Sequence, residues 1–314
     1  FLVMGKLGLI IKLNIFFLLF FTNPCFSNEI FLPYEYGCTV NNEILSLKEP
    51  PMSGYEIYEL EERLLELGYD PGKVDGVFDQ STERAVKEFQ KDQRLPISGR
   101  VDETVWKHLA QETDKPASSQ IPPPEGFVSL VINLDTNTLT VYSDQDIYKE
   151  YPVAIGKSDS PSPVGEWRII QKSLNWGGGF GTRWLGLNVP WGIYGIHGTN
   201  KPWSIGQMAS KGCFRMFNQD VEEIYPWVKY GTPVTVIGEL KYLPWHRERD
   251  LKQGAIGSDV VALQLELKKE GLLWGTADGH FGPLTGIAIK YFQTLNGLNS
   301  DGVVEKNTKK LLGL

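Results

Sequence analysis

Apolar residues recur at helical spacing near both ends of the chain and alternate with polar residues in the middle. In the first of these regions, Leu60, Leu64 and Leu67 lie three or four positions apart, which predicts one face of a helix that ends at Gly68. A second apolar face follows the turn "DGVFDQST", in which Asp79 is a favourable N-cap residue. That face holds Ala85, Val86 and Phe89. Each segment therefore predicts a short amphipathic helix whose apolar side belongs to a core.

The same pattern returns 203 residues later without a gap. The shared positions carry mainly apolar residues and glycines, and in the first copy they are Leu60, Leu64, Gly68, Asp75, Gly76, Phe78, Thr82, Ala85, Phe89, Gln90, Leu95, Gly99 and Val101. In the second copy they are Leu263, Leu267, Gly271, Asp278, Gly279, Phe281, Thr285, Ala288, Phe292, Gln293, Leu298, Gly302 and Val304. There, Pro283 stands at the start of a helix, where its missing N–H costs no hydrogen bond. We predict two related three-helix modules at residues 45–112 and 254–314.

Between the two copies the pattern changes to that of strands. In residues 127–238, "FVSLVINL", the turn "DTN" and "TLTVYS" predict a hairpin, and "YKEYPVAIG", "EWRII", "WLGLNV" and "TPVTVIG" predict further strands. Only "NQDVEEIYPWVKYG" indicates a helix in this part. A segment rich in Pro and Ser at 113–126 and a less distinct joint at 239–253 are predicted linkers. The predicted fold class is multidomain, with an all-β domain flanked by two small three-helix modules.

The first 27 residues differ from the rest of the chain. Lys6 and Lys12 precede the apolar run "LNIFFLLFF", and small residues follow near Ser27, which is the pattern of a secretory signal peptide over residues 1–27. An uncleaved anchor is the alternative, but the run is shorter than the ~20 residues that a spanning helix needs. We therefore expect an exported protein with no stable membrane insertion after signal cleavage.

Charge and cysteine usage exclude several classes of function. The net charge of −7 opposes nucleic-acid binding, which requires a basic surface. The three cysteines and four histidines form no CxxC, HxxxH or HExxH motif, so we expect neither a metal nor a cofactor. After export, Cys38 and Cys213 would remain. A disulfide between them is one interpretation, because thiols oxidise outside the cell.

One segment, "IHGTNKPWSIGQMASKGCFRM", places His197 and Cys213 among glycines and small polar residues. Each alone has an ordinary interpretation, as a core histidine or a buried structural cysteine. However, Gly212 lets the backbone approach a bound carbonyl, and Ser210 and Lys211 make the surroundings of the thiol polar. Such surroundings lower a thiol pKa from its usual ~8.5. His197 is the only histidine of the middle domain, so the pair indicates nucleophilic catalysis.

Two kinds of longer segment resemble known families. "LGYDPGKVDGVFDQSTERAVKEFQKDQRLPISGRVDETVW" and "EGLLWGTADGHFGPLTGIAIKYFQTLNGLNSDGVVEKNT" resemble the peptidoglycan-binding domain of bacterial wall enzymes. "IHGTNKPWSIGQMASKGCFRM" resembles the signature of the L,D-transpeptidases of the YkuD type, which is HGT, then SxGC, an aliphatic or aromatic residue, Arg and Met. "SPVGEWRII", "FGTRWLGL" and "GTPVTV" extend this resemblance across the middle domain.

The resemblance implies roles for the residues of the signature. Cys213 would be the nucleophile and His197 its base, with the imidazole ring oriented by the carbonyl of Gly198. N–H groups around Gly212 and Cys213, beside Ser210, would hold the oxyanion.

Three further residues have less defined roles. Arg215 either supplies positive charge to the site or braces the loop through a carboxylate of the core. Many family members carry His where this chain has Lys211, and the role of this lysine stays open. Tyr194 belongs to the segment "NWGGGFGTRWLGLNVPWGIYG", whose aromatic residues are typical of a core and whose glycine run is typical of a mobile loop over a groove. We count Tyr194 among the candidate substrate contacts.

The predicted function is that of a peptidoglycan L,D-transpeptidase in the bacterial cell wall or periplasm. It would cross-link stem peptides through an acyl-enzyme on Cys213, accept carbapenems at the same sulfur, and use the helical modules to stay on peptidoglycan. One alternative is an L,D-carboxypeptidase, in which water resolves the same acyl-enzyme. The other is a wall-binding protein without catalytic activity.

Overall fold

The computed structural model describes residues 43–110, 121–174, 178–239 and 249–314. Within these ranges no helix is both long and apolar enough to cross a membrane. The predicted signal peptide, Cys25 and Cys38, and most of both predicted linkers lie outside the described residues. The described residues, which include both helical modules and the β domain, lie within one compact unit.

The first helical module consists of the three helices that the pattern predicts. They are α1 (Tyr55–Glu66), α2 (Gln80–Asp92) and α3 (Glu103–Ala110). Asp79 caps α2, because its carboxylate accepts the N–H groups of Ser81 and Thr82. The predicted apolar faces form the core of the module, which contains Leu60, Leu64, Phe78, Ala85, Val86 and Phe89.

The second helical module repeats this arrangement with α5 (Ser258–Lys269), α6 (Pro283–Leu295) and α7 (Lys306–Leu312). Pro283 is the first residue of α6, as predicted. A buried polar side chain holds the Asp-Gly turn in both copies: Glu61 accepts the N–H of Gly76 at 2.8 Å, and Gln264 accepts the N–H of Gly279 at 2.8 Å. The repeat in the sequence is therefore a repeat of the same local structure.

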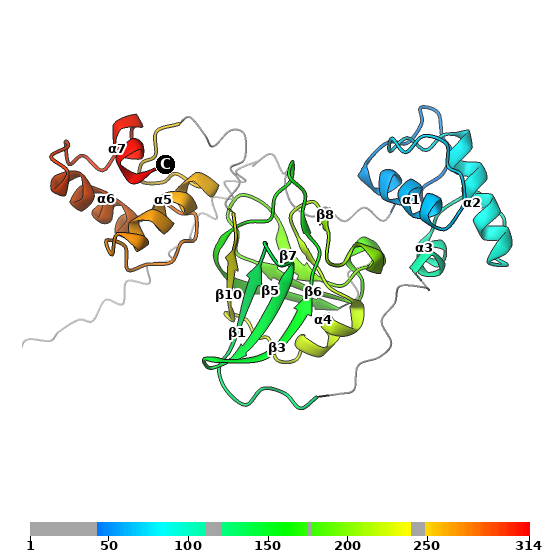
Figure 1. Ribbon diagram of the computed structural model, residues 1–314, viewed down its shortest axis with the longest axis horizontal. Helices are drawn as coiled ribbons and strands as arrows, with labels where there is room; N and C mark the ends of the chain where they lie inside the picture. Colours follow the sequence, from blue (N-terminus) through cyan, green and yellow to red (C-terminus); the bar gives the residue numbers. More distant parts are fainter. Residues whose placement is uncertain (1–42, 111–120, 175–177, 240–248) are drawn as a thin grey trace, which may run out of the picture. The chain divides into compact units, whose positions relative to one another are not determined.

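The β domain is built on one curled sheet, shown with its strand labels in Figure 1. Its strand order is β3-β2-β1-β10-β5-β6-β7-β9, and a separate parallel pair joins β4 and β8. The bounds of the strands are β1 Val128–Asn133, β2 Thr138–Ser143, β3 Asp146–Pro152, β4 Ile155–Gly156, β5 Gly165–Leu174, β6 Arg183–Leu187, β7 Tyr194–His197, β8 Met208–Ser210, β9 Phe214–Arg215 and β10 Pro233–Ile237. In the large sheet, neighbouring strands are antiparallel except for β1 with β10 and β7 with β9.

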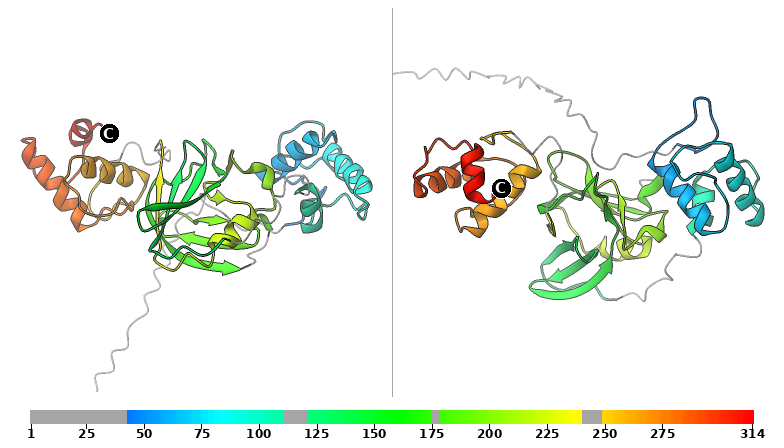
Figure 2. Two further views of the ribbon diagram at one scale, coloured as in Figure 1. Left: turned by 60° about the horizontal axis from the view of Figure 1, so that its bottom comes forward. Right: turned by 45° about the horizontal axis from the view of Figure 1, so that its top comes forward.

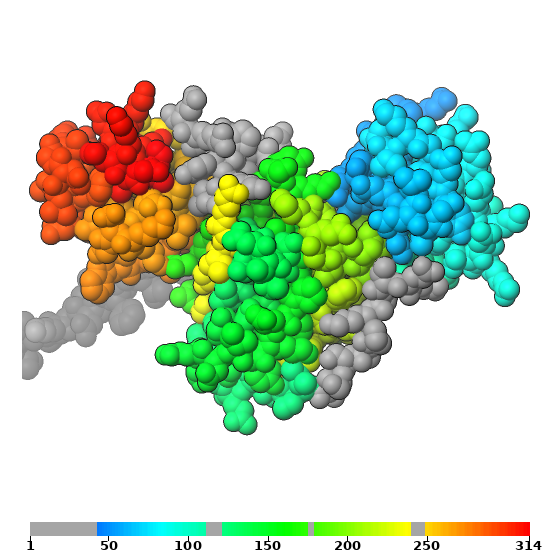
Figure 3. Space-filling view, in the orientation of Figure 1, coloured from blue at the N-terminus to red at the C-terminus, as the bar shows by residue number. Residues whose placement is uncertain are grey.

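Two 3-10 turns and one helix complete the β domain. They are η1 (Gly178–Phe180), η2 (Pro202–Ser204) and α4 (Asn218–Ile224), the last of which lies within the segment predicted as helical. The curl of the sheet is clearest in Figure 2. In the space-filling view, β10 forms a yellow stripe along the visible face of the domain (Figure 3). The sequence therefore predicted the fold class correctly, although it gave no indication of the short strands β8 and β9.

The core of the β domain extends into the second module. Val261 of α5 and Ala277 belong to the same cluster of buried apolar residues as Trp167. Beside this contact, Glu166 accepts the N–H of Ala277 at 2.9 Å and pairs with Lys268 at 2.5 Å. The second module thus contacts the β domain mainly through buried apolar side chains.

Candidate active site

His197 is the last residue of β7, and neighbouring aromatic rings fix its position. In the sheet it pairs with Trp184 of β6 on one side and with Arg215 of β9 on the other. The ring of Phe180 approaches the imidazole edge-on at 4.8 Å between centroids, and the ring of Trp184 stacks on it at 5.7 Å. The Nδ1 atom lies 2.5 Å from the carbonyl oxygen of Gly198, so that carbonyl orients the ring.

The electrostatic environment keeps the imidazole of His197 neutral. Burial, as the largest cause, and the positive charge of Arg215 together lower the pKa of His197 to about 3, while backbone hydrogen bonds at Gly198 and Phe180 oppose the shift. The Nε2 atom is buried and has no hydrogen-bond partner among the described residues. A neutral ring whose Nδ1 faces a carbonyl carries its proton there and can accept a proton at Nε2.

Cys213 stands directly before β9 and shares the aromatic neighbours of His197. It forms a small buried cluster with Phe180 and Trp184, and its Sγ lies 3.9 Å from the carbonyl oxygen of Ile193. The site thus brings Cys213 and His197 to the same pair of rings. In this structure Cys213 is disulfide-bonded, whereas its sequence setting favours a free thiol over a disulfide. The other two cysteines of the chain lie outside the described residues.

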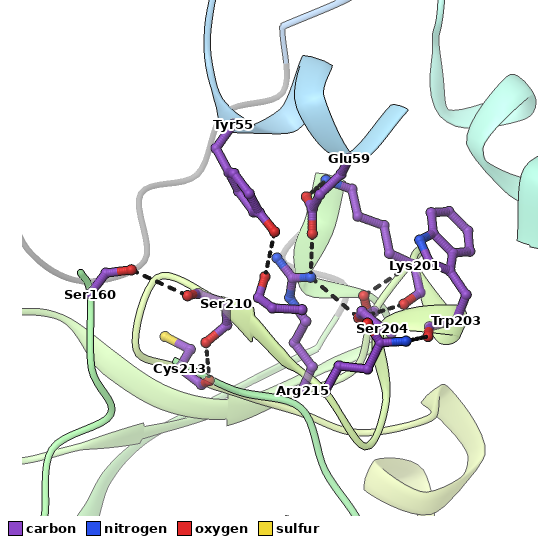
Figure 4. Close-up of polar contacts among 12 residues, drawn as sticks. Tyr55, Glu59, Ser160, Lys201, Trp203, Ser204, Ser210, Cys213 and Arg215 are labelled. Carbon is purple, nitrogen blue, oxygen red and sulfur yellow. Dashed lines mark hydrogen bonds and ion pairs between the residues drawn. The ribbon is translucent and has the colours of Figure 1, made fainter. Parts of the chain in front are cut away.

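The turn that presents Cys213 is braced by Ser210, as Figure 4 shows. The Ser210 hydroxyl donates to the carbonyl of Cys213 at 2.6 Å and accepts the N–H of Gly212 at 3.0 Å. Gly212 has φ +104°, and a Cβ there would lie 2.7 Å from a ring carbon of Tyr194. Tyr194 is buried at 2% exposure, so it supports the turn from behind. The N–H of Gly212, which we expected to face an oxyanion, is thus engaged by Ser210 in this structure.

Asn218 is a site residue that the sequence analysis missed. Its side-chain oxygen accepts the N–H groups of Thr199 and Thr182, and its amide donates to the carbonyl of Thr199 at 2.8 Å. A Cβ at Gly198 would lie 2.2 Å from the same oxygen, so only glycine fits there. Asn218 therefore fixes the loop whose carbonyl orients His197. The only feature of the sequence that could have indicated Asn218 was its position at the start of a predicted helix.

Arg215 is held by a carboxylate, but not by one from the core of the β domain. One guanidinium nitrogen lies 2.7 Å from Oε1 of Glu59, on helix α1 of the first module, and 3.3 Å from the hydroxyl of Ser204 (Figure 4). Lys201 pairs with the other oxygen of Glu59. Bracing by a carboxylate was one of the two roles considered for Arg215, and here that carboxylate comes from the helical module and not from the core.

A pocket of about 220 Å³ opens at His197. The β domain lines it with Phe180, Lys211 and Arg215, and the first module lines it with Tyr55 and Glu56, among others. Among the described residues, no group of three or more His, Cys, Asp or Glu side chains could hold a metal ion.

Comparison with known proteins agrees with this division of the chain. The family model described as "L,D-transpeptidase catalytic domain" matches residues 128–236, and the one described as "Putative peptidoglycan binding domain" matches residues 53–109 and 256–312. The "Putative L,D-transpeptidase YkuD" of Bacillus subtilis is 45% identical over 34% of this chain and 64% of its own length. The "Putative L,D-transpeptidase YqjB" of Bacillus subtilis is 35% identical over 36% of this chain and 73% of its own length.

The chain belongs to the L,D-transpeptidase family.

The similarity within this family concerns the catalytic domain. The chain covers 64% of the length of the relative YkuD, so the similarity does not extend to the whole of that protein. A solved L,D-transpeptidase from Mycobacterium smegmatis matches with 23% identity and a TM-score of 0.31 over 36% of this chain and 59% of its own.

Proposed function

We propose that the protein is an exported peptidoglycan L,D-transpeptidase that works through an acyl-enzyme on Cys213. The donor is a stem tetrapeptide, and the acceptor is an amine of a neighbouring stem. The two helical modules bind peptidoglycan and hold the enzyme on its substrate. The observation that carries the proposal is that His197 and Cys213 share Phe180 and Trp184 as neighbours while the Gly198 carbonyl fixes the imidazole.

The reaction starts from the reduced form of Cys213. His197 accepts the thiol proton at Nε2, and the thiolate attacks the carbonyl carbon of the third stem residue, forming a C–S bond. When the tetrahedral intermediate collapses, the C–N bond to the terminal D-Ala breaks and His197 returns the proton to the leaving amine. We assign stabilisation of the oxyanion to the N–H of Cys213, since Ser210 already engages that of Gly212.

The second half of the reaction regenerates the enzyme. The acceptor amine attacks the thioester and loses a proton to His197, a new C–N bond forms, the C–S bond breaks, and His197 passes the proton to the sulfur of Cys213. The aromatic enclosure supports this step, because rings that exclude water give the amine an advantage over hydrolysis.

Mass spectrometry of muropeptides tests this function. Reduced enzyme is incubated with a soluble stem tetrapeptide, and we expect loss of D-Ala together with a cross-linked dimer. Cys213→Ser should give neither product, because a serine hydroxyl is scarcely ionised at neutral pH, while Cys38→Ser should retain both.

The alternatives predict different products. Loss of D-Ala with only a tripeptide product would assign the chain to the L,D-carboxypeptidases. No reaction by the reduced wild type, combined with sedimentation on insoluble peptidoglycan, would leave a wall-binding protein.

Carbapenems provide a second test that needs no acceptor. A strained β-lactam should acylate the reduced Cys213 and increase the intact mass by that of the drug. An adduct on any other residue, or none on the reduced protein, would contradict the proposed nucleophile.

A further inference from the structure

The first helical module contacts the segment that carries the catalytic signature through one stripe of helix α1. Tyr55, Glu59 and Arg63 lie four positions apart, so they share one face of the helix. The hydroxyl of Tyr55 donates to the carbonyl of Ala209 at 3.2 Å, and the guanidinium of Arg63 lies 4.9 Å from the ring centre of Trp203. Trp203 of η2 and Ala209 of β8 both lie in the stretch that precedes Cys213.

Glu59 is the centre of this contact. Its side chain is only 4% exposed and is paired with Arg215 and Lys201, which are 12% and 5% exposed. Burial alone would raise the pKa of Glu59, but the two cations outweigh it and lower the pKa, so the carboxylate is ionised. Without this carboxylate, the two largely buried cations would lose the partner that pairs with both of them.

The second copy of the repeat serves as an internal comparison. The positions equivalent to Tyr55 and Glu59 are Ser258 and Ala262, although the core and turn positions of the two copies match. The helix fold therefore does not require an acidic residue at position 59. Residues that contact the catalytic segment are among those that differ between the two copies.

The contact of Glu59 with Arg215 and Lys201 also affects the pocket at His197. Arg215 pairs with His197 in the sheet and is the charge that acts on its imidazole. The charged side chains that line the pocket are Glu43, Glu56 and Glu59 from the first module and Lys201, Lys211 and Arg215 from the β domain. Beside them, the ammonium of Lys157 lies 3.3 Å from the ring centre of Tyr55. Glu59 thus sets both the placement and the net charge of the cationic side of this pocket.

We propose that the first helical module is a working part of the active site, and that Glu59 is a positioning residue which holds Arg215 and Lys201 at the pocket and balances their charge. The proposal rests on the function assigned above. It gives the two modules different roles: the first completes the substrate pocket, whereas the second has no carboxylate at the equivalent position.

The test compares Glu59→Gln, Glu59→Asp and the control Glu62→Gln, each in the full chain after reduction. Glu62 is an exposed carboxylate on the same helix. With a soluble tetrapeptide, Glu59→Gln should lower kcat/KM about 10- to 100-fold, since small displacements of positioned groups have effects of this size. Glu59→Asp should recover part of the loss, and Glu62→Gln should match the wild type.

Alkylation of Cys213 by iodoacetamide, followed by peptide mass mapping, provides a readout that does not depend on turnover. Loss of the Glu59 charge makes the net charge around Arg215 and Lys201 more positive, which favours the thiolate. The midpoint of the pH dependence should therefore fall by about one unit in Glu59→Gln and stay near that of the wild type in Glu59→Asp. Loss of local structure would instead move the midpoint upward, towards the ~8.5 of an ordinary thiol.

The remaining outcomes separate this inference from the proposed function. If the wild type has no turnover, the proposed function fails, and the alkylation profiles still decide the role of Glu59. An unchanged kcat/KM and an unchanged midpoint in Glu59→Gln would overturn the inference alone. A higher kcat/KM in Glu59→Gln would also overturn it, because it would mean that the module covers the pocket against substrate.

Discussion

Replacing Gly212 with alanine should displace the turn that presents Cys213. At this position φ is +104°, where a side chain costs about 1–3 kcal/mol of backbone strain. The added Cβ would also lie 2.7 Å from Tyr194 Cε1 and 3.1 Å from the carbonyl oxygen of Pro161. Favourable contacts between carbons need about 3.5–4.0 Å, and Tyr194 is too buried to move away freely.

The two effects can be added and then separated by a control. Overpacking of this kind costs about 1–3 kcal/mol, so the free energy of unfolding should fall by about 2–6 kcal/mol in Gly212→Ala. Gly206→Ala in the same domain is the matched control, because Gly206 has φ +86° but a Cβ added there would have no atom within 4 Å. It should show only the strain, about 1–3 kcal/mol.

Urea unfolding of both variants, together with alkylation of reduced Cys213, measures the difference. We expect Gly212→Ala to be the less stable variant and to react with iodoacetamide at an altered rate, while Gly206→Ala reacts like the wild type. Equal destabilisation of the two variants, with unchanged reactivity in both, would refute the claim that Tyr194 supports this turn.

Three further predictions concern other parts of the structure. The folded state holds His197 neutral, with a pKa of about 3 against 6.5 for an ordinary histidine, so the free energy of unfolding of the wild type should fall by up to ~4–5 kcal/mol between pH 6.5 and pH 3. In urea titrations, His197→Gln should lose less stability over the same pH range. Without a reducing agent the disulfide at Cys213 should prevent alkylation and turnover, and reaction before reduction would contradict the disulfide. Trp167→Ala, at 1% exposure, should lower the free energy of unfolding by ~3–5 kcal/mol, whereas Trp274→Ala, at 96% exposure, should change it by less than ~0.5 kcal/mol in the same assay.

Local features of the fold were predictable because their causes are local in the sequence. Asp79 and Pro283 mark helix starts through the hydrogen-bonding properties of their own residue types, and the structure confirms both. The alternating pattern likewise gave most strands of the β domain. The order of the strands in the sheet was not predictable in this way, because β10 lies between β1 and β5 although it is far from both in the sequence.

In the candidate site, too, the sequence indicated some residues but not the contacts between distant parts of the chain. His197 and Cys213 stood out because their residue types are rare in this chain and their neighbours are unusual for a core. The contact of Arg215 with Glu59 spans 156 positions, and any of the 38 acidic residues of the chain could have supplied that carboxylate. The one signal was the difference between Glu59 and Ala262 in the repeat, which a comparison limited to shared residues overlooks.

The parallel pairing of β1 with β10 has a mechanical consequence. The chain enters the β domain at β1 and leaves it at β10, and these strands run side by side with Leu130 opposite Val234 and Asn133 opposite Ile237. A pulling force between the flanking modules would therefore act at opposite ends of this strand pair and along its length. Such a load shears all the hydrogen bonds between the two strands at once, whereas pulling from one end would open them in sequence. A domain connected in this way resists tension from a stretched polymer better than a hairpin of equal length.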